Sequence, residues 1–148
     1  MGLLSQIGSG PVALDSAIFI YFIERDPRYL SIVKPLFAAI TEGRLQGVTS
    51  SLTLLETLVV PLRAGNMVVA GHYERLLTQG HGLQLVPIDL DLLRAAAHLR
   101  ATTHLKTPDS LQLAAALSFG CSVFVANDHR IPSVPGLQVL QIEDYPEP

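Results

Sequence analysis

The sequence predicts an α/β fold, a single three-layer domain in which a mostly parallel sheet carries helices on both faces. Short apolar runs, typical of strands buried on both sides, alternate along the chain with longer segments of helical periodicity. No tight hairpin signal such as Asn-Gly joins two strands, so helical crossovers are expected. The 148 residues and the 49% hydrophobic content suit one domain, residues 1–148, with a core on each face of the sheet.

The first expected strand is Val12–Leu14, and it ends at a carboxylate, Asp15. An apolar segment of about two helical turns follows and reaches Glu24. A strand that stops at an Asp and turns at once into a helix places that Asp at the carboxyl edge of the sheet, where open α/β sheets bind ligands. Asp15 is therefore a candidate ligand as well as a candidate helix N-cap.

The next helix is expected over residues 28–41, because Asp26-Pro27 combines an N-cap residue with Pro at the first helical position. Residues 46–50 are a short strand candidate. A serine pair at 50–51 then provides the cap of a further helix, Leu52–Arg63.

The central part of the chain continues the alternation. Asn66 is the expected N-cap of a helix that ends at Gly80. A strand at 83–87 follows, and Asp89 or Asp91 caps a helix over residues 92–103.

The last part repeats the same pattern. Thr107-Pro108-Asp109 predicts a helix start with a cap and a Pro, and Gly120 ends that helix. Residues 121–126 are a buried strand, 127–130 a loop, and 139–142 a final edge strand.

Composition limits the classes of protein. The single cysteine, Cys121, excludes an internal disulfide and favours a reducing, cytoplasmic compartment. The first eleven residues carry no secretory signal, and no apolar stretch approaches the roughly 18 residues of a membrane span. A net charge of −3 argues weakly against general nucleic-acid binding. If four of the acids hold a metal ion, however, the rest of the chain is slightly basic and can still face a phosphate backbone.

Four carboxylates stand out, and each also has an ordinary structural explanation. Glu56 interrupts an apolar helix, where an unpaired carboxylate would cost several kcal/mol by rough expectation unless that side of the helix is wet. Asp109 falls in a first helical turn, where the helix dipole alone would favour it. Asp128 follows its strand as Asp15 does, although Asn-Asp also suits a simple turn.

Taken together, these four residues predict a metal site at the carboxyl edge of the sheet. Such a cluster would repel itself without cations, so some members would hold a proton. Hard oxygen ligands suit Mg²⁺, or Mn²⁺, rather than zinc. One cysteine and five scattered histidines, without a His-x-x-x-His pair, also argue against zinc, and His129 is interpreted as a loop residue.

At these residues the sequence resembles the PIN domain family. Leu14-Asp15-Ser16 with the apolar run that follows resembles the opening motif of the family. The run from Thr107 to Ala116 resembles its Asp-Ala-x-x-x-Ala-x-Ala helix, and Val125-Ala126-Asn127-Asp128 resembles the Thr-Asn-Asp that follows the fourth strand. Glu56 matches the single helical Glu of the family. The resemblance covers about residues 12–142, and the size is similar to the VapC-like toxins of toxin–antitoxin pairs.

The resemblance implies a parallel sheet of strand order 3-2-1-4-5 and Mg²⁺-dependent endoribonuclease activity. It also implies an antitoxin that blocks the site and a homodimer. Asp15 and Asp109 would be central ligands, and Glu56 and Asp128 would bind directly or through water. The side chains with supporting roles would be Ser16 and Asn127 at the site, and Lys106, Arg130 and Arg25 along the RNA backbone.

One departure from the family pattern concerns the residue before Asn-Asp. The family commonly has Thr or Ser there, whereas this chain has Ala126, and Ser16 is the candidate replacement for the missing hydroxyl. This departure favours an alternative in which the protein is a catalytically weak or inactive module that acts by binding a partner.

Two other enzyme classes fit less well. A phosphatase with Asp15 as nucleophile would need a second Asp two residues on, where the chain has Ala17. A Ser or Cys hydrolase lacks support, because no Gly-x-Ser-x-Gly motif occurs and Cys121 opens an apolar strand.

Overall fold

A computed structural model describes residues 2–146 of the chain. It contains one sheet of five strands in the order β3-β2-β1-β4-β5, and every neighbouring pair is parallel. The predicted fold class and strand order are therefore confirmed, and β5 lies at an edge as expected. The strands are β1 (Val12–Leu14), β2 (Gly47–Ser50), β3 (Leu83–Val86), β4 (Val123–Ala126) and β5 (Gln138–Gln141).

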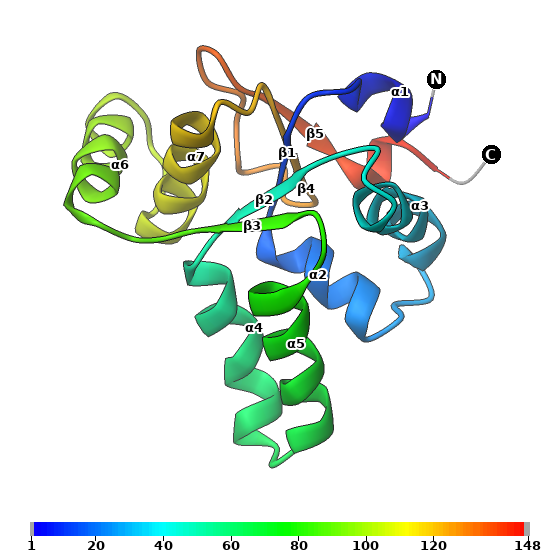
Figure 1. The fold of residues 1–148 in the computed structure, drawn as a ribbon. Helices are drawn as coiled ribbons and strands as arrows, with labels where there is room; N and C mark the ends of the chain where they lie inside the picture. The colour runs from blue at the N-terminus through cyan, green and yellow to red at the C-terminus, as the bar shows by residue number, and fades with distance from the viewer. Residues whose placement is uncertain (1, 147–148) are drawn as a thin grey trace.

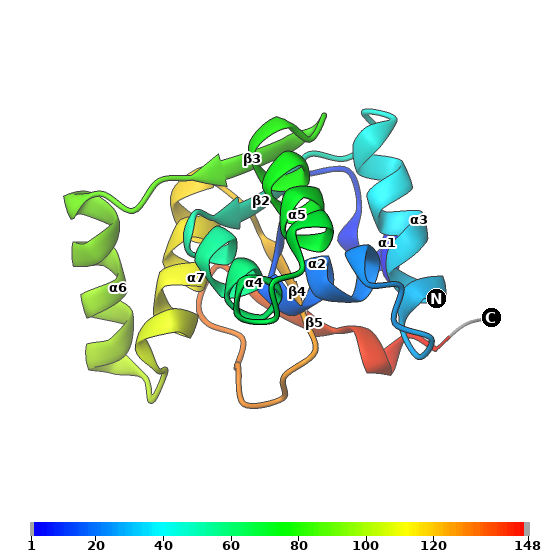
Figure 2. The same cartoon turned by 90° about the horizontal axis from the view of Figure 1, so that it is seen from below.

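Helices cover both faces of this sheet (Figures 1 and 2). The helices α1, α2 and α3 lie on one face and α6 and α7 on the other, while α4 and α5 form a pair at the edge where β1 and β2 end (Figure 1). Their bounds are α1 (Leu3–Ile7), α2 (Ser16–Ile23), α3 (Leu30–Thr41), α4 (Leu52–Arg63), α5 (Met67–Gln79), α6 (Leu90–Thr102) and α7 (Thr107–Phe119). Within residues 2–146, none of these helices combines the length and the apolar character that a membrane span requires.

The central strands divide the core between the two faces. In β1, Val12 and Leu14 pack with α1, α2 and α3, whereas Ala13 between them packs with residues of α7. This alternation follows from the two-residue period of a strand, and it explains why both faces of β1 are apolar. Cys121, just before β4, belongs to the α7 side and is 3% exposed.

Several element boundaries differ from the predicted ones. The segment before Val12 contains a helix, α1, that the sequence patterns did not predict, and its Leu3 and Ile7 are buried in the core. The helix predicted from residue 28 begins at Leu30 instead. Asp26 accepts a hydrogen bond from the Arg28 backbone N–H at 2.8 Å, so it closes the turn before α3 rather than capping the helix.

The predicted caps were partly right. Asn66 and Asp89 accept hydrogen bonds from the backbone N–H groups of Val69 and Leu92, so both cap their helices as expected. Thr107, by contrast, is the first residue of α7 and not its cap.

Candidate active site

Asp15 lies at the junction of β1 and α2. It is next to β4, the strand that pairs with β1 on the side opposite to β2. Its backbone N–H donates to the Val125 carbonyl of β4 at 3.0 Å, which extends the pairing of the two strands by one residue. Its Oδ1 accepts from the Ser16 backbone N–H at 2.9 Å, so the expected capping role is observed. Strand order reverses between β1 and β4, and in open α/β sheets this is the place where ligands bind.

The charge environment of Asp15 is the clearest sign of an unusual site. Burial and, to a lesser degree, the charges of Glu56, Asp109 and Asp128 raise the pKa of its carboxyl group to about 7, although the hydrogen bond from Ser16 opposes the rise. The other three predicted carboxylates therefore all lie within electrostatic reach of Asp15.

Glu56 reaches this site from α4, but not for the reason that the sequence suggested. Its neighbours Val59 and Val60 are 38% and 65% exposed, and the buried side of α4 carries Thr53 and Thr57. Burial of the Glu56 carboxyl group raises its pKa, hydrogen bonds from Gln112 and Ser16 lower it, and the charge of Asp109 raises it. The compensation predicted for this carboxylate thus comes from polar side chains.

Asp109 is the third residue of α7, in the first turn, where the helix dipole favours a negative charge. Burial raises the pKa of its carboxyl group, and the charge of Asp128 adds to this rise. The cationic side chains of Arg130 and Lys106 act in the opposite direction.

Asp128 differs from the other three because it has a cationic partner. Its Oδ1 and Oδ2 accept from Arg130 Nε and Nη2 at 2.9 Å and 2.8 Å, and this pairing holds the pKa of the carboxyl group below its usual value. Gln141 of β5 fixes the same loop, because its Nε2 donates to the Asp128 carbonyl at 2.9 Å.

Asn127 lies beside this loop and is only half satisfied. Its Nδ2 donates to the Tyr21 hydroxyl at 3.3 Å. Its Oδ1 is buried and, among residues 2–146, has no hydrogen-bond partner. A buried amide oxygen in this condition is a ready ligand for a cation or for an ordered water.

The donor set suits a hard divalent cation in its chemistry, although the side chains do not form a finished coordination sphere. All the candidate donors are oxygens, and the mutual repulsion at Asp15 is what a bound cation would relieve. In residues 2–146, however, no three His, Cys, Asp or Glu side chains lie close enough together to hold one ion. Asp128 pairs instead with Arg130, whose Nη2 lies 2.8 Å from Asp128 Oδ2.

The candidate RNA-backbone cations fall into two groups. Lys106 and Arg130 line a pocket of about 200 Å³ together with Asp109 and His104, next to the carboxylates. Arg25 lies beyond the far end of α2, a helix of eight residues, which spans roughly 12 Å. The structure thus brings two of the three cations to the site.

A comparison with protein families identifies the family to which this fold belongs. The model of the PIN domain family matches residues 12–137 of this chain. The chain belongs to the PIN domain family. No curated protein matches the chain.

Solved structures of similar fold include a toxin–antitoxin complex and a toxin. VapBC2 from Rickettsia felis, bound to a DNA fragment from its promoter, has a TM-score of 0.66 at 15% identity, over 88% of this chain and 98% of that chain. A toxin–antitoxin complex from Klebsiella pneumoniae has a TM-score of 0.66 at 18% identity, over 88% and 97%. VapC20 from Mycobacterium tuberculosis, a sarcin-ricin loop cleaving toxin, has a TM-score of 0.66 at 15% identity, over 81% and 92%. At these identities the likeness is one of fold.

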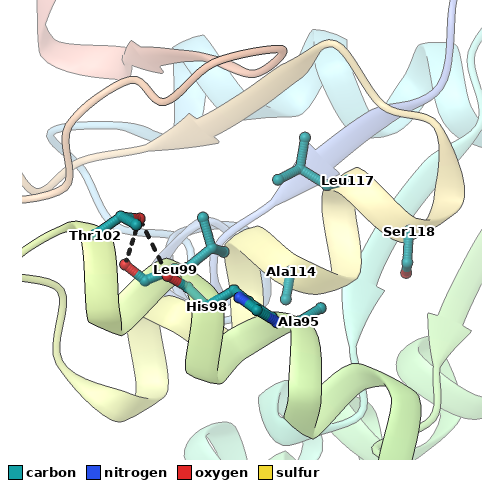
Figure 3. A pocket seen from close by; sticks show the side chains of 7 residues that line it. All are labelled: Ala95, His98, Leu99, Thr102, Ala114, Leu117 and Ser118. Carbon is teal, nitrogen blue, oxygen red and sulfur yellow. Dashed lines mark hydrogen bonds between the residues drawn. The ribbon is translucent and has the colours of Figure 1, made fainter.

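This PIN domain also has a pocket away from the carboxylates. It has a volume of about 460 Å³ and lies between α6 and α7, at the half of α7 that is remote from Asp109 (Figure 3). Ala95, Leu99 and Leu117 make its wall largely apolar, and His98 lies at its side (Figure 3). None of its lining residues is acidic, so it is not an extension of the candidate site.

The sequence analysis missed one group of residues in this PIN domain. Gln112 is 2% exposed, and its amide contacts Thr53, Glu56 and the Ser50 backbone. A signal was present, because Gln112 is the one polar residue in the buried run from Leu111 to Ala116. A polar side chain inside such a run needs a partner.

Proposed function

We propose that this protein is a divalent-metal-dependent endoribonuclease and the toxin of a toxin–antitoxin pair. The observation that carries the proposal is Asp15, a carboxyl group at the switch point whose pKa burial and three further carboxylates raise to about 7. PIN domain proteins are generally nucleases, and one structural neighbour is a toxin that cleaves the sarcin-ricin loop. RNA is therefore the substrate class that we propose.

Each carboxylate has a separate task in this proposal. Asp15 and Asp109 would hold Mg²⁺, or Mn²⁺ in its place, and Glu56 and Asp128 would contribute directly or through water. When bound, the ion supplies an acidified water molecule and positive charge beside the phosphate. Ser16 orients Asp15 through its backbone N–H, and Asn127 would assist through its buried Oδ1, which has no hydrogen-bond partner within residues 2–146.

The cations next to the carboxylates would position the RNA. Lys106 and Arg130 line the pocket beside Asp109 and would contact phosphates without reading sequence. Arg130 also pairs with Asp128, so the RNA phosphate and the Asp128 carboxylate would compete for one guanidinium group.

The partners and the location follow from the same proposal. We propose an antitoxin that covers the site, a homodimer, and action in the cytoplasm, where RNA and a reduced Cys121 are expected. The structural neighbours support the antitoxin, because VapBC2 and the Klebsiella complex belong to toxin–antitoxin systems. A small open reading frame beside this gene, whose product binds this protein and stops RNA cleavage, would support the toxin assignment.

The decisive test is RNA cleavage by two charge-neutral variants. Asp15→Asn and Asp109→Asn should each lower the rate about a hundredfold or more, because the cation contributes several kcal/mol to the barrier. EDTA should abolish cleavage by the wild type. Asp91→Asn is a matched control, since Asp91 also lies in a first helical turn, that of α6, but is exposed and lines a pocket with Ser118, at the other end of α7 from Asp109. Full activity of both site variants would refute the mechanism.

A second candidate function is a PIN domain that binds a partner without cleaving RNA. Ala126, which is fully buried at the end of β4, favours it because no hydroxyl stands before Asn127. Calorimetry with Mg²⁺ and Mn²⁺, beside a nuclease assay on mixed RNAs, separates the two functions. Metal binding without cleavage would favour the binding module.

A further inference from the structure

A seam of buried polar side chains lies directly beneath the candidate site, where β2, α4 and α7 meet. Thr49, Ser50, Thr53 and Gln112 are each 2% exposed or less. Elsewhere in the described core the side chains are almost all apolar. Burying this many polar groups is costly unless each has a hydrogen-bond partner, so the pattern of bonds in the seam is informative.

The backbone groups at the two ends of the seam fix its direction. The Ser50 N–H can only donate, and it lies 3.3 Å from Gln112 Oε1. The Leu14 carbonyl can only accept, and it lies 2.8 Å from the Thr49 hydroxyl oxygen. The amide oxygen of Gln112 is thereby assigned to the β2 side. The single hydroxyl proton of Thr49 points to Leu14, because its other acceptor, Gln112 Oε1, is much farther away at 3.5 Å.

The remaining bonds then have one possible polarity. Because the Thr49 proton is committed to Leu14, the Thr53 hydroxyl must donate to Thr49, at 2.7 Å. Thr53 must then accept from Gln112 Nε2, at 2.8 Å. The second proton of the Gln112 amide is left for Glu56 Oε1, at 3.4 Å. A one-way chain thus runs from Gln112 through two hydroxyls to the residue before Asp15.

We propose that Gln112 is a positioning residue for Glu56, which it ties through Thr53 and Thr49 to the end of the strand that carries Asp15. Because the amide presents only an N–H donor to Glu56, it stabilises the ionised carboxylate and holds Oε1 toward Gln112. This inference rests on the proposed nuclease function for its purpose, but the link itself is a property of the protein without metal. Gln112 touches neither substrate nor ion and acts only through Glu56.

The first experiment is a double-mutant cycle on unfolding in urea with EDTA, with Gln112→Met, Glu56→Gln and the double variant. The proposal expects an interaction of roughly fivefold in the unfolding equilibrium constant, because the bond ends on a charged group. Thr57→Val is the matched control. Thr57 is equally buried and next to Glu56, but its hydroxyl bonds only to carbonyls of its own helix. Its cycle with Glu56→Gln should stay within about twofold of additivity.

A second pair of variants, in which the carboxylate and the amide are exchanged, keeps the test informative even if Gln112→Met does not fold. Gln112→Glu keeps an acceptor for the Ser50 N–H but sets a carboxylate against Glu56, so it should destabilise the protein. Glu56→Gln in the same chain should restore part of the stability, since the amide of residue 56 can then donate to the carboxylate of residue 112, although the bond to Thr53 stays lost. Additive effects in the two cycles that combine Gln112→Met or Gln112→Glu with Glu56→Gln would overturn the proposal.

The second experiment measures function. Gln112→Met should lower Mn²⁺ affinity, measured by calorimetry, roughly tenfold, as the loss of a positioning group typically does. It should lower kcat by a similar factor and leave KM for RNA within about twofold, because Lys106 and Arg130 are untouched. Unchanged Mn²⁺ affinity and kcat in a folded variant would overturn the positioning role. Coupling in both cycles with a wild type that neither binds Mn²⁺ nor cleaves RNA would support the link and refute the nuclease.

Discussion

At the scale of single residues, the main question is why one carboxyl group tolerates its surroundings. Asp15 is held by strand pairing and by its own capping bond, so it has no freedom to leave the site. Asp128, on a loop, has turned to Arg130 instead. Burial, together with the neighbouring carboxylates, therefore raises the pKa of Asp15, whereas the pairing with Arg130 lowers the pKa of Asp128.

A pH dependence of stability follows from the raised pKa of Asp15. With a folded pKa of about 7 against 3.8 for the free group, the folded state binds the proton more tightly than the unfolded state. Its contribution is complete below about pH 4 and is lost as pH rises to about 7, a loss of up to roughly 4 kcal/mol. Asp15→Asn should remove this fall.

The measurement is urea unfolding in EDTA from pH 4 to 8, and the quantity of interest is the difference between wild type and variant. Asp91→Asn should follow the wild type at every pH, because Asp91 is exposed. A wild type whose stability runs parallel to that of Asp15→Asn would contradict the prediction.

At the scale of elements, the ends of helices and strands decide where the site residues lie. The turn into β3 is the tightest example, because Gly82 has a φ of +79° and an added Cβ would lie 2.4 Å from the Ile40 carbonyl oxygen of α3. Gly65, between α4 and α5, has a similar φ of +69° but open space around it. A side chain at Gly65 would therefore meet only backbone strain, whereas one at Gly82 would meet both backbone strain and a steric clash.

These two glycines give a paired prediction. Gly65→Ala should cost about 1 kcal/mol of unfolding free energy, the penalty of a left-handed conformation alone. Gly82→Ala should cost roughly 2–4 kcal/mol, since α3 or β3 must also shift. Equal losses in chemical denaturation would show that the contact with Ile40 relaxes freely.

At the scale of the whole molecule, a chain of net charge −3 is proposed to bind a polyanion. The negative total charge does not exclude this binding, because Lys106 and Arg130 lie beside the carboxylates, where the RNA is proposed to bind. The only other lysine, Lys34, lies exposed on α3. The field near the proposed RNA path is therefore set by a few cations and not by the total charge.

The two lysines allow a matched test of this electrostatic arrangement. Lys106→Ala should raise KM for RNA several-fold and reduce the slope of log KM against log salt by about 0.7, the loss of one phosphate contact. Lys34→Ala should change neither quantity. Identical salt slopes for the two variants would place the RNA elsewhere.

Much of this structure was predictable from local patterns. Apolar runs and turn residues predicted all five strands, whereas the strand order that brings Asp15 and Asp128 after neighbouring strands came from the family resemblance. The α1 helix was not predictable in this way. Its five residues are too short for helical propensity to act, and the packing of Leu3 and Ile7 holds it in place.

The environment of the site was less predictable than its position. Helical spacing suggested that Val59 and Val60 bury Glu56, yet tertiary packing turned the threonine side of α4 inward. The seam around Gln112 depends on three elements that meet only in the folded chain. Whether the four carboxylates act as a metal site stays a prediction from sequence.

The single cysteine makes it possible to measure how often the protein opens locally. Cys121 is 3% exposed, and burial raises the pKa of its thiol to about 11, so neither access nor ionisation favours attack in the closed molecule. A thiol-specific dye can therefore label the chain only during openings of the α7 face, and the labelling rate counts those openings. A ligand that stabilises the closed state of this face would slow the labelling of Cys121, and no engineered probe is needed to detect it.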